Sequence, residues 1–209
     1  MSERKLRGTI IGAGFFAGFQ AEGWQRIPGV EIVAVADPRI ERAREFASRF
    51  SIPRVYAEAE ALLQGEQPDF VDIVTRPDSH LPLVELAASH RVQIICQKPM
   101  APTWKECVAM VEHCQRADVR LLIHENWRWQ PWYREVKKLI DGEVFGRIFH
   151  FGFCLRNGDG RGEELYTVQP YFREMPRLLI YETLVHSGRR SGLGRIGLLR
   201  FGQNQNAEH

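Results

Sequence analysis

The chain has 209 residues, of which 44% are hydrophobic and 26% are charged, a composition typical of a globular protein with one well-buried core or one domain and part of another. Its formal charge of +2 is too small and too dispersed to indicate a nucleic-acid or membrane partner, although four arginines between positions 189 and 200 make the C-terminal part locally basic. The N-terminus is charged and lacks a signal-peptide apolar segment, and no apolar run approaches a membrane span. We therefore expect a cytoplasmic protein.

The first structural signal is a short apolar strand, Thr9–Ile11, followed by the pattern Gly12-x-Gly14-x-x-Ala17 and a helix. In a dinucleotide-binding unit, Gly12 allows the tight turn, Gly14 lets the backbone approach a pyrophosphate, and Ala17 lets helix and strand pack closely. The N–H groups and positive dipole end of the helix then face the phosphates. The pattern alone also fits an ordinary strand-turn-helix.

A second apolar strand, Glu31–Ala36, strengthens the dinucleotide interpretation. It ends at Asp37, about 20 residues past the glycines, where the ribose-binding acid of a Rossmann unit belongs. An acid there favours NAD, because it bonds ribose hydroxyls and repels a 2′-phosphate. The nearby Arg39 and Arg42 leave NADP open as the alternative coenzyme.

Further strands and helices alternate along the chain, which predicts an α/β fold with a Rossmann-type, doubly wound parallel sheet. After Asp37-Pro38 we expect a helix whose sheet-facing residues are Ile40, Ala43, Phe46, Ala47 and Phe50, then a weak strand near Val55-Tyr56 and a helix over Glu58–Gln64. A strand over Phe70–Val74 follows. The next helix is capped by Ser79 or Asp78 and turns Leu83, Leu86 and Ala87 inward, and it leads to a strand over Val92–Cys96. Thr103-Trp-Lys-Glu106 is a capping box that begins a helix with Cys107, Val108, Val111 and Cys114 on its apolar face, and Arg120–His124 is the last strand.

The four cysteines, Cys96, Cys107, Cys114 and Cys154, form neither a Cys-x-x-Cys pair nor a metal-ligand spacing. Two of them fall on one face of a predicted helix. We expect core thiols in a reducing compartment, with no metal site, rather than disulfides.

From Glu125 the composition changes to a run dense in tryptophan and tyrosine, which favours the core of a hinge between domains over stacking on a ligand. Gly146–Leu155 alternates in part and predicts the first strand of a second sheet, and Leu178–His186 predicts a helix. The remainder, with its many glycines and arginines, is typical of an irregular tail. We therefore expect domains over residues 1–124 and 125–186, and a tail over 187–209.

Several of these motifs together resemble the glucose-fructose oxidoreductase / inositol dehydrogenase / MocA (Gfo/Idh/MocA) family. They are Gly12-x-Gly14-x-x-Ala17, Asp37-Pro38, Thr75-Arg-Pro-Asp-Ser-His80, Cys96-Gln-Lys-Pro99 and Glu182-Thr-Leu-Val-His186. The resemblance implies a Rossmann domain joined to a second, here incomplete, α+β domain. It also implies an NAD(P)-dependent oxidoreductase that transfers hydride between the nicotinamide and a hydroxyl carbon of a sugar, polyol or related small molecule.

By position, the resemblance implies that Lys98 and His186 are the catalytic residues. A histidine with a pKa near neutrality can take the proton of the substrate hydroxyl, and an ammonium beside the oxygen stabilises developing negative charge. The same resemblance implies coenzyme contacts from Gly12, Gly14, Phe15, Phe16, Ala17, Asp37, Thr75, Pro77, His80, Gln97, Lys98 and Asn126, and substrate contacts from Lys98, Arg128, Glu182 and His186. Three of these residues have a plainer alternative. Lys98 can be an exposed lysine at a strand end, His80 a packing residue at a helix start, and His186 a histidine whose hydrogen bonds are satisfied within a helix.

The sequence also departs from the family pattern. Gln97 replaces a common glutamate, so the carboxylate support for a charged Lys98 is absent. Glu182 fills an aspartate position, and Arg189 stands where an aspartate often contacts substrate.

The resemblance stops after His186, and most of the second sheet is missing. We expect a truncated or frame-shifted member in which the usual dimerisation sheet is absent. A homo-oligomer is therefore left as an open alternative. The alternative function is a catalytically inactive cofactor-binding module.

Overall fold

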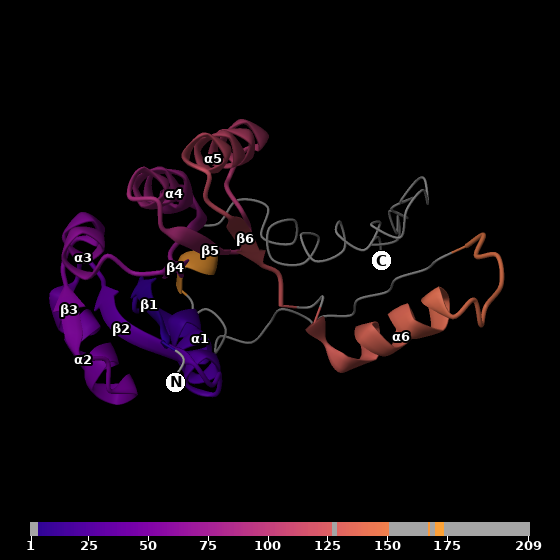
Figure 1. Ribbon diagram of the computed structural model, residues 1–209, viewed down its shortest axis with the longest axis horizontal. Coiled ribbons are helices and arrows are strands. Elements are labelled where there is room, and N and C mark those ends of the chain that lie inside the picture. Colours follow the sequence, from indigo (N-terminus) through magenta and orange to yellow (C-terminus); the bar gives the residue numbers. More distant parts are fainter. Residues whose placement is uncertain (1–3, 127–128, 151–166, 168–169, 174–209) are drawn as a thin grey trace, which may run out of the picture. The chain divides into compact units, whose positions relative to one another are not determined.

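The computed structural model describes residues 4–126, 129–150, 167 and 170–173, and the chain groups into two compact units (Figure 1). The first unit contains residues 1–125 and 162–176, and the second contains 126–161 and 177–209. Phe172 in the short 3₁₀ helix Pro170–Arg173 is buried within the first unit.

The first unit is built on a six-stranded parallel sheet with the order β3-β2-β1-β4-β5-β6. Its strands are β1 (Leu6–Ile11), β2 (Val30–Ala36), β3 (Arg54–Tyr56), β4 (Phe70–Ile73), β5 (Gln93–Gln97) and β6 (Leu121–His124). The chain leaves β1 in one direction for β2 and β3, and in the other for β4, β5 and β6. The strand order therefore reverses between β1 and β4, where open parallel sheets bind their ligands.

Helices cover both faces of this sheet (Figure 1). The helices α1 (Phe15–Gln25) and α2 (Ile40–Phe50) bury side chains in one apolar cluster, and α3 (Ala59–Glu66), α4 (His80–Ser89) and α5 (Trp104–Ala117) bury theirs in another. Alternate residues of each strand point to opposite faces, so Ile10 enters the first cluster and Ile11 the second. The predicted doubly wound α/β fold is confirmed.

The buried face of α5 differs from the sequence prediction. Cys107 and Cys114 pack toward the core as expected, but Val108 and Val111 are 36% and 41% exposed, and Met110 is the most deeply buried residue of the helix. Helical spacing shows that the helix has an apolar face, whereas the side of the helix that becomes buried is decided by the position of α4 and the sheet. Cys96, Cys107 and Cys114 are free thiols, as expected; Cys154 lies outside the described residues.

The start of α4 also differs from the prediction. Pro77–Ser79 forms a 3₁₀ turn ahead of His80, and neither Ser79 nor Asp78 caps the helix. The Ser79 hydroxyl instead donates to the Thr75 hydroxyl (2.7 Å) or the Arg76 carbonyl (2.8 Å). The Ser79 hydroxyl is thereby hydrogen-bonded within the loop after β4.

A buried carboxylate, Glu66 at the end of α3, joins distant parts of the sheet. It accepts hydrogen bonds from Arg7 of β1, from Arg54 of β3 and from the Tyr56 hydroxyl. Burial by itself would raise the pKa of Glu66, but the bonds from Arg54 and Tyr56 outweigh it, so the pKa lies below its usual value.

In the second unit, the described residues form one helix, α6 (Pro131–Asp141). Residues 146–150 carry no strand, in contrast to the prediction for the start of this segment, and residues 151–155 lie outside the described part. The segments 178–186 and 187–209 lie outside it too. None of the helices in the described part combines the length and apolar character of a bilayer span.

The capping box of α5 is formed as predicted and gives a stability test. Glu106 N–H donates to Thr103 Oγ1 (3.2 Å), and Thr103 N–H donates to Glu106 Oε2 (2.9 Å). We expect Thr103→Ala to lower the free energy of unfolding by about 1 kcal/mol, because an orphan helix donor loses its acceptor. Urea denaturation followed by circular dichroism measures this. Thr103→Ser retains the cap and is the control; an equal loss in both variants would contradict the capping role.

Candidate functional site

The turn after β1 is fixed by Gly12. Its φ is +100°, and a Cβ built on it would lie 2.4 Å from the main-chain oxygen of Val74. Gly12 N–H donates to the Ala36 carbonyl (2.7 Å), and Val74 N–H donates to the Ile11 carbonyl (2.8 Å). The ends of β1, β2 and β4 thus meet so closely at this turn that only glycine fits.

The helix that follows begins without a side-chain cap. Gly14 occupies the N-cap position, no side chain accepts a hydrogen bond from the first turn there, and that turn contains no acidic residue. The helix therefore presents main-chain N–H groups and its positive dipole end without a carboxylate in its own first turn. A Cβ at Gly14 would only reach ordinary contact, 3.6 Å from Arg42 Nη2, so the protein itself does not require glycine at this position.

Asp37 stands at the end of β2, against the same turn. Its Oδ2 accepts from Ala13 N–H (3.0 Å), its Oδ1 accepts from Arg39 N–H (3.0 Å), and its side chain is 10% exposed. Each carboxylate oxygen retains capacity for a further donor. The arrangement fixes an acceptor beside the glycine turn that a ribose hydroxyl can reach.

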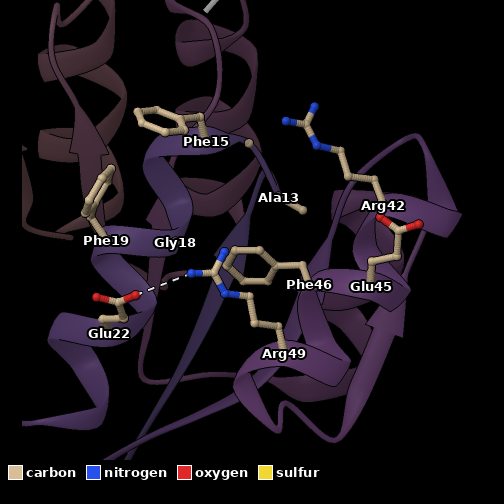
Figure 2. Close-up of a pocket in the computed structure, with 10 residues that line it drawn as sticks. Ala13, Phe15, Gly18, Phe19, Glu22, Arg42, Glu45, Phe46 and Arg49 are labelled. Carbon is tan, nitrogen blue, oxygen red and sulfur yellow. Dashed lines mark hydrogen bonds and ion pairs between the residues drawn. The ribbon is translucent and has the colours of Figure 1, made fainter. Parts of the chain in front are cut away.

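A cavity of about 330 Å³ lies between α1 and α2 and reaches the glycine turn (Figure 2). An ion pair between Glu22 and Arg49 (3.5 Å) crosses it away from the turn. Arg42 is half-buried at its other end and forms no ion pair with any described residue. The lining residues are Ala13, Gly14, Phe15, Gly18, Phe19, Glu22, Arg42, Glu45, Phe46 and Arg49.

The second side of the site is formed by the turns after β4 and β5, and His80 joins them. The His80 ring is fully buried, with Nδ1 at 3.1 Å from the carbonyl oxygens of both Pro99 and Met100 and Nε2 at 3.2 Å from that of Thr75. Burial lowers the pKa of His80 although these carbonyl groups oppose the shift. His80 therefore acts here as a buried tie between the Thr75 turn and the turn at the cis peptide Lys98–Pro99.

Lys98 leaves the sheet at the end of β5 and is half-buried. Its main-chain N–H donates to the side-chain oxygen of Gln97 (2.7 Å), and Gln97 is itself buried. The Gln97 side chain therefore contacts the Lys98 backbone.

The sequence interpretation missed a buried acid beneath these turns. Asp72, in the middle of β4, is 1% exposed, and its Oδ2 accepts from the indole N–H of Trp24 (2.7 Å). Burial raises the pKa of Asp72 to about 7, against the lowering effect of that hydrogen bond. The signal in the sequence that could have indicated this residue was a single acid within the apolar run Phe70–Val74.

The predicted residues fall into two groups around the reversal of strand order. Strand register places Ile11 opposite both Ala36 and Ile73, and Ile73 opposite Cys96, so the turns after these strands leave the sheet at one edge. Gly12, Gly14, Phe15, Phe16, Ala17 and Asp37 form one group, and Thr75, Pro77, His80, Gln97 and Lys98 form the other. Asn126 belongs to the second unit, where its Oδ1 is buried without a partner among the described residues. Arg128, Glu182 and His186 lie outside the described part.

A doubly wound sheet with a positive-φ glycine turn at its reversal point and an acid at the end of β2 defines a dinucleotide-binding protein. The sequence model of the oxidoreductase family with an NAD-binding Rossmann fold (Gfo/Idh/MocA) matches residues 6–125. The chain belongs to this family, and the resemblance seen in its motifs is confirmed.

Individual relatives agree with the family. The chain is 38% identical to a D-apiose dehydrogenase of Rhizobium rhizogenes, over 90% of this chain and 53% of that protein, and 39% identical to one of Paraburkholderia graminis, over 88% and 48%. A crystal structure of an oxidoreductase from Agrobacterium radiobacter in complex with NAD+, L-tartaric acid and magnesium has a TM-score of 0.78 and 36% identity, over 88% of this chain and 52% of that one. The chain spans about half the length of these relatives.

The two glycines make opposite predictions. Gly12→Ala should lower the free energy of unfolding by about 2 kcal/mol or more, because it combines a strained φ with a main-chain clash. Gly14→Ala should cost only about 1 kcal/mol or less, since its backbone is in the extended region. Urea titration of both variants measures the difference. A loss at Gly14 as large as that at Gly12 would contradict the distinct roles assigned to them.

Proposed function

We propose that the chain is the coenzyme-binding part of an NAD-dependent oxidoreductase that transfers hydride between the nicotinamide and a hydroxyl carbon of a sugar, polyol or related compound. The observation that supports this most directly is the pairing of the Gly12–Gly14 turn with Asp37 at the reversal of strand order. Family membership and the relatives' names, D-apiose dehydrogenase among them, support the substrate class.

The residues present fit a dinucleotide. The uncapped amides of α1 suit a diphosphate, and the space above Gly14 would be reduced by any side chain there. Asp37 would accept from the adenosine ribose hydroxyls. When bound, the coenzyme supplies or accepts the hydride.

NAD is proposed over NADP because of charge. The Asp37 carboxylate, held by Ala13 and Arg39, would repel a ribose 2′-phosphate at close range. Arg42, half-buried beside Gly14 and without an ion pair in the described part, is the residue that favours NADP. NADP binding is therefore proposed to be weaker rather than absent.

The chain's own residues supply the proton chemistry in this proposal. Lys98, at the sheet edge where hydride transfer would take place, stabilises negative charge on the substrate oxygen, and His186 takes the hydroxyl proton. Asn126 would add a coenzyme contact, and Arg128 and Glu182 would bind substrate hydroxyls. We also propose a cytoplasmic location, which is supported by the three free thiols among the described residues. Assembly into a homo-oligomer stays a prediction.

A second candidate function is a coenzyme-binding module without turnover. The observation in its favour is that the chain spans about half the length of its relatives. Coenzyme binding is common to both candidates, and product formation separates them.

The coenzyme preference is tested by titrating intrinsic fluorescence with NADH and NADPH. We expect NADH to bind at least about tenfold more tightly than NADPH, because an acid faces the ribose. Asp37→Asn retains an acceptor for Ala13 N–H but removes the charge, so the two affinities should converge. Arg42→Ala should weaken NADPH more than NADH. Tighter binding of NADPH by the unaltered chain would reject the NAD assignment, and no binding of either would reject the function.

Turnover is tested by following NADH formation with a panel of sugars and polyols that includes D-apiose. If the chain is active, Lys98→Met should lower kcat by about a hundredfold or more, because it retains the side chain's bulk but removes the ammonium. Lys105→Met, an exposed lysine on α5, is the control and should leave kcat unchanged. NADH binding without product across the panel would favour the non-catalytic module.

A further inference from the structure

A chain of hydrogen-bonded, buried polar side chains runs from β4 to β5 on the face of the sheet that α1 covers, and it ends at the main chain of Lys98. It begins at Trp24 and Asp72 and continues through Gln20 of α1 to Gln97 at the end of β5. Asp72, Gln20 and Gln97 are each at most 6% exposed. Buried polar groups at this depth must pair donors with acceptors, because an unpaired one costs about 1–3 kcal/mol.

Only one orientation of the Gln20 amide gives both its oxygen and its nitrogen complementary partners. In it, Gln20 Nε2 donates to both carboxylate oxygens of Asp72, at 2.7 Å for Oδ1. Gln20 Oε1 then accepts from Gln97 Nε2 (2.8 Å) and from His124 Nδ1 (2.6 Å). The opposite orientation directs the Gln20 oxygen at the carboxylate and its nitrogen at the Gln97 nitrogen.

The chain therefore has a direction. Lys98 N–H donates to Gln97 Oε1, Gln97 Nε2 donates to Gln20 Oε1, and Gln20 Nε2 donates to Asp72. Asp72 is the terminal acceptor, and both amides are oriented by it. Removing the carboxylate removes what orients Gln20, and hence what orients Gln97 against the Lys98 backbone.

A carboxylate at position 97 does not fit this direction. It could still accept from Lys98 N–H, but it would face the Gln20 oxygen with a second acceptor. Rotating the Gln20 amide would satisfy position 97 and turn the amide oxygen toward Asp72. With two acids at the ends of one buried amide, one of them must take up a proton.

We propose that Asp72 is a positioning residue whose carboxylate fixes, through Gln20 and Gln97, the main chain at Lys98. This inference rests on the proposed function for the role of Lys98. It accounts for the orientation of the Gln97 amide, because the Asp72 carboxylate on β4 orients Gln20, and Gln20 orients Gln97 at the end of β5.

The inference identifies a rescuing pair of substitutions. In Asp72→Asn with Gln97→Glu, the asparagine oxygen accepts from Trp24 and its nitrogen donates to Gln20. The Gln20 amide rotates and donates to Glu at position 97 and to His124, which takes its other tautomer. The direction between positions 72 and 97 is reversed, every group is paired, and the Lys98 N–H still has its acceptor.

The experiment compares the unaltered chain, Asp72→Asn, Gln97→Glu and the double variant at pH 8, which lies above the pKa of about 7 of Asp72 and so favours its carboxylate form. Each single substitution should weaken NADH binding about tenfold or more, because it leaves a mismatched pair beside Lys98. The double variant should bind within about threefold of the unaltered chain. Its urea midpoint should also exceed the value expected from adding the two single shifts.

Asp118→Asn combined with Gln97→Glu is the matched control. Asp118 is exposed, has a left-handed backbone conformation in which asparagine is equally tolerated, and takes no part in the hydrogen bonds between Asp72 and Lys98. Its substitution should therefore not restore NADH binding. Additive effects in the Asp72/Gln97 pair, or equal rescue by the control, would overturn the inference. If no variant binds NADH, the proposed function fails, and additivity or rescue in the urea midpoints still decides whether the chain of hydrogen bonds has this direction.

Discussion

The close approach of three strand ends at Gly12 is the constraint on which the rest of the site depends. Because the Gly12 N–H is bonded to the end of β2 and Val74 N–H to the end of β1, the turn has no space for a Cβ. This contact sets the start of α1, and therefore the direction in which its first amides point. It also brings Asp37 against Ala13 N–H. The proposed coenzyme site at this edge thus follows from how tightly the sheet closes at its reversal point.

Three buried carboxylates show how differently the same group can be used. Glu66 is surrounded by two guanidinium groups and a phenol, and its role is to tie β1, β3 and α3 together. Asp37 has two main-chain donors and stands at an open edge, so it can accept more. Asp72 has only neutral donors and lies deep in the sheet. Direct hydrogen bonds from two arginines and a tyrosine make Glu66 a structural group, whereas position and spare acceptor capacity make Asp37 and Asp72 candidates for function.

The far side of the site is organised by side chains that join loops rather than by secondary structure. His80 contacts carbonyl groups from the turns after β4 and β5, and Gln97 contacts the main chain of Lys98. Such ties reduce the freedom of the loops before any ligand arrives, which is the physical content of preorganisation. At position 97 the buried environment favours an amide, because the Gln97 side chain both accepts from Lys98 N–H and donates to Gln20.

The sequence by itself determined the order of strands and helices, the glycine turn, Asp37 and the α5 capping box, because each is encoded within a few neighbouring residues. It failed where a neighbour in space decides: Val108 and Val111 face away from the core because α4 and the sheet cover the other side of α5. The Ser79 hydroxyl bonds within its loop instead of capping α4. The Asp72–Gln20–Gln97 chain was invisible in the sequence, since its members belong to β4, α1 and β5. Only the packing of α1 on the sheet brings their side chains together and gives their hydrogen bonds a direction.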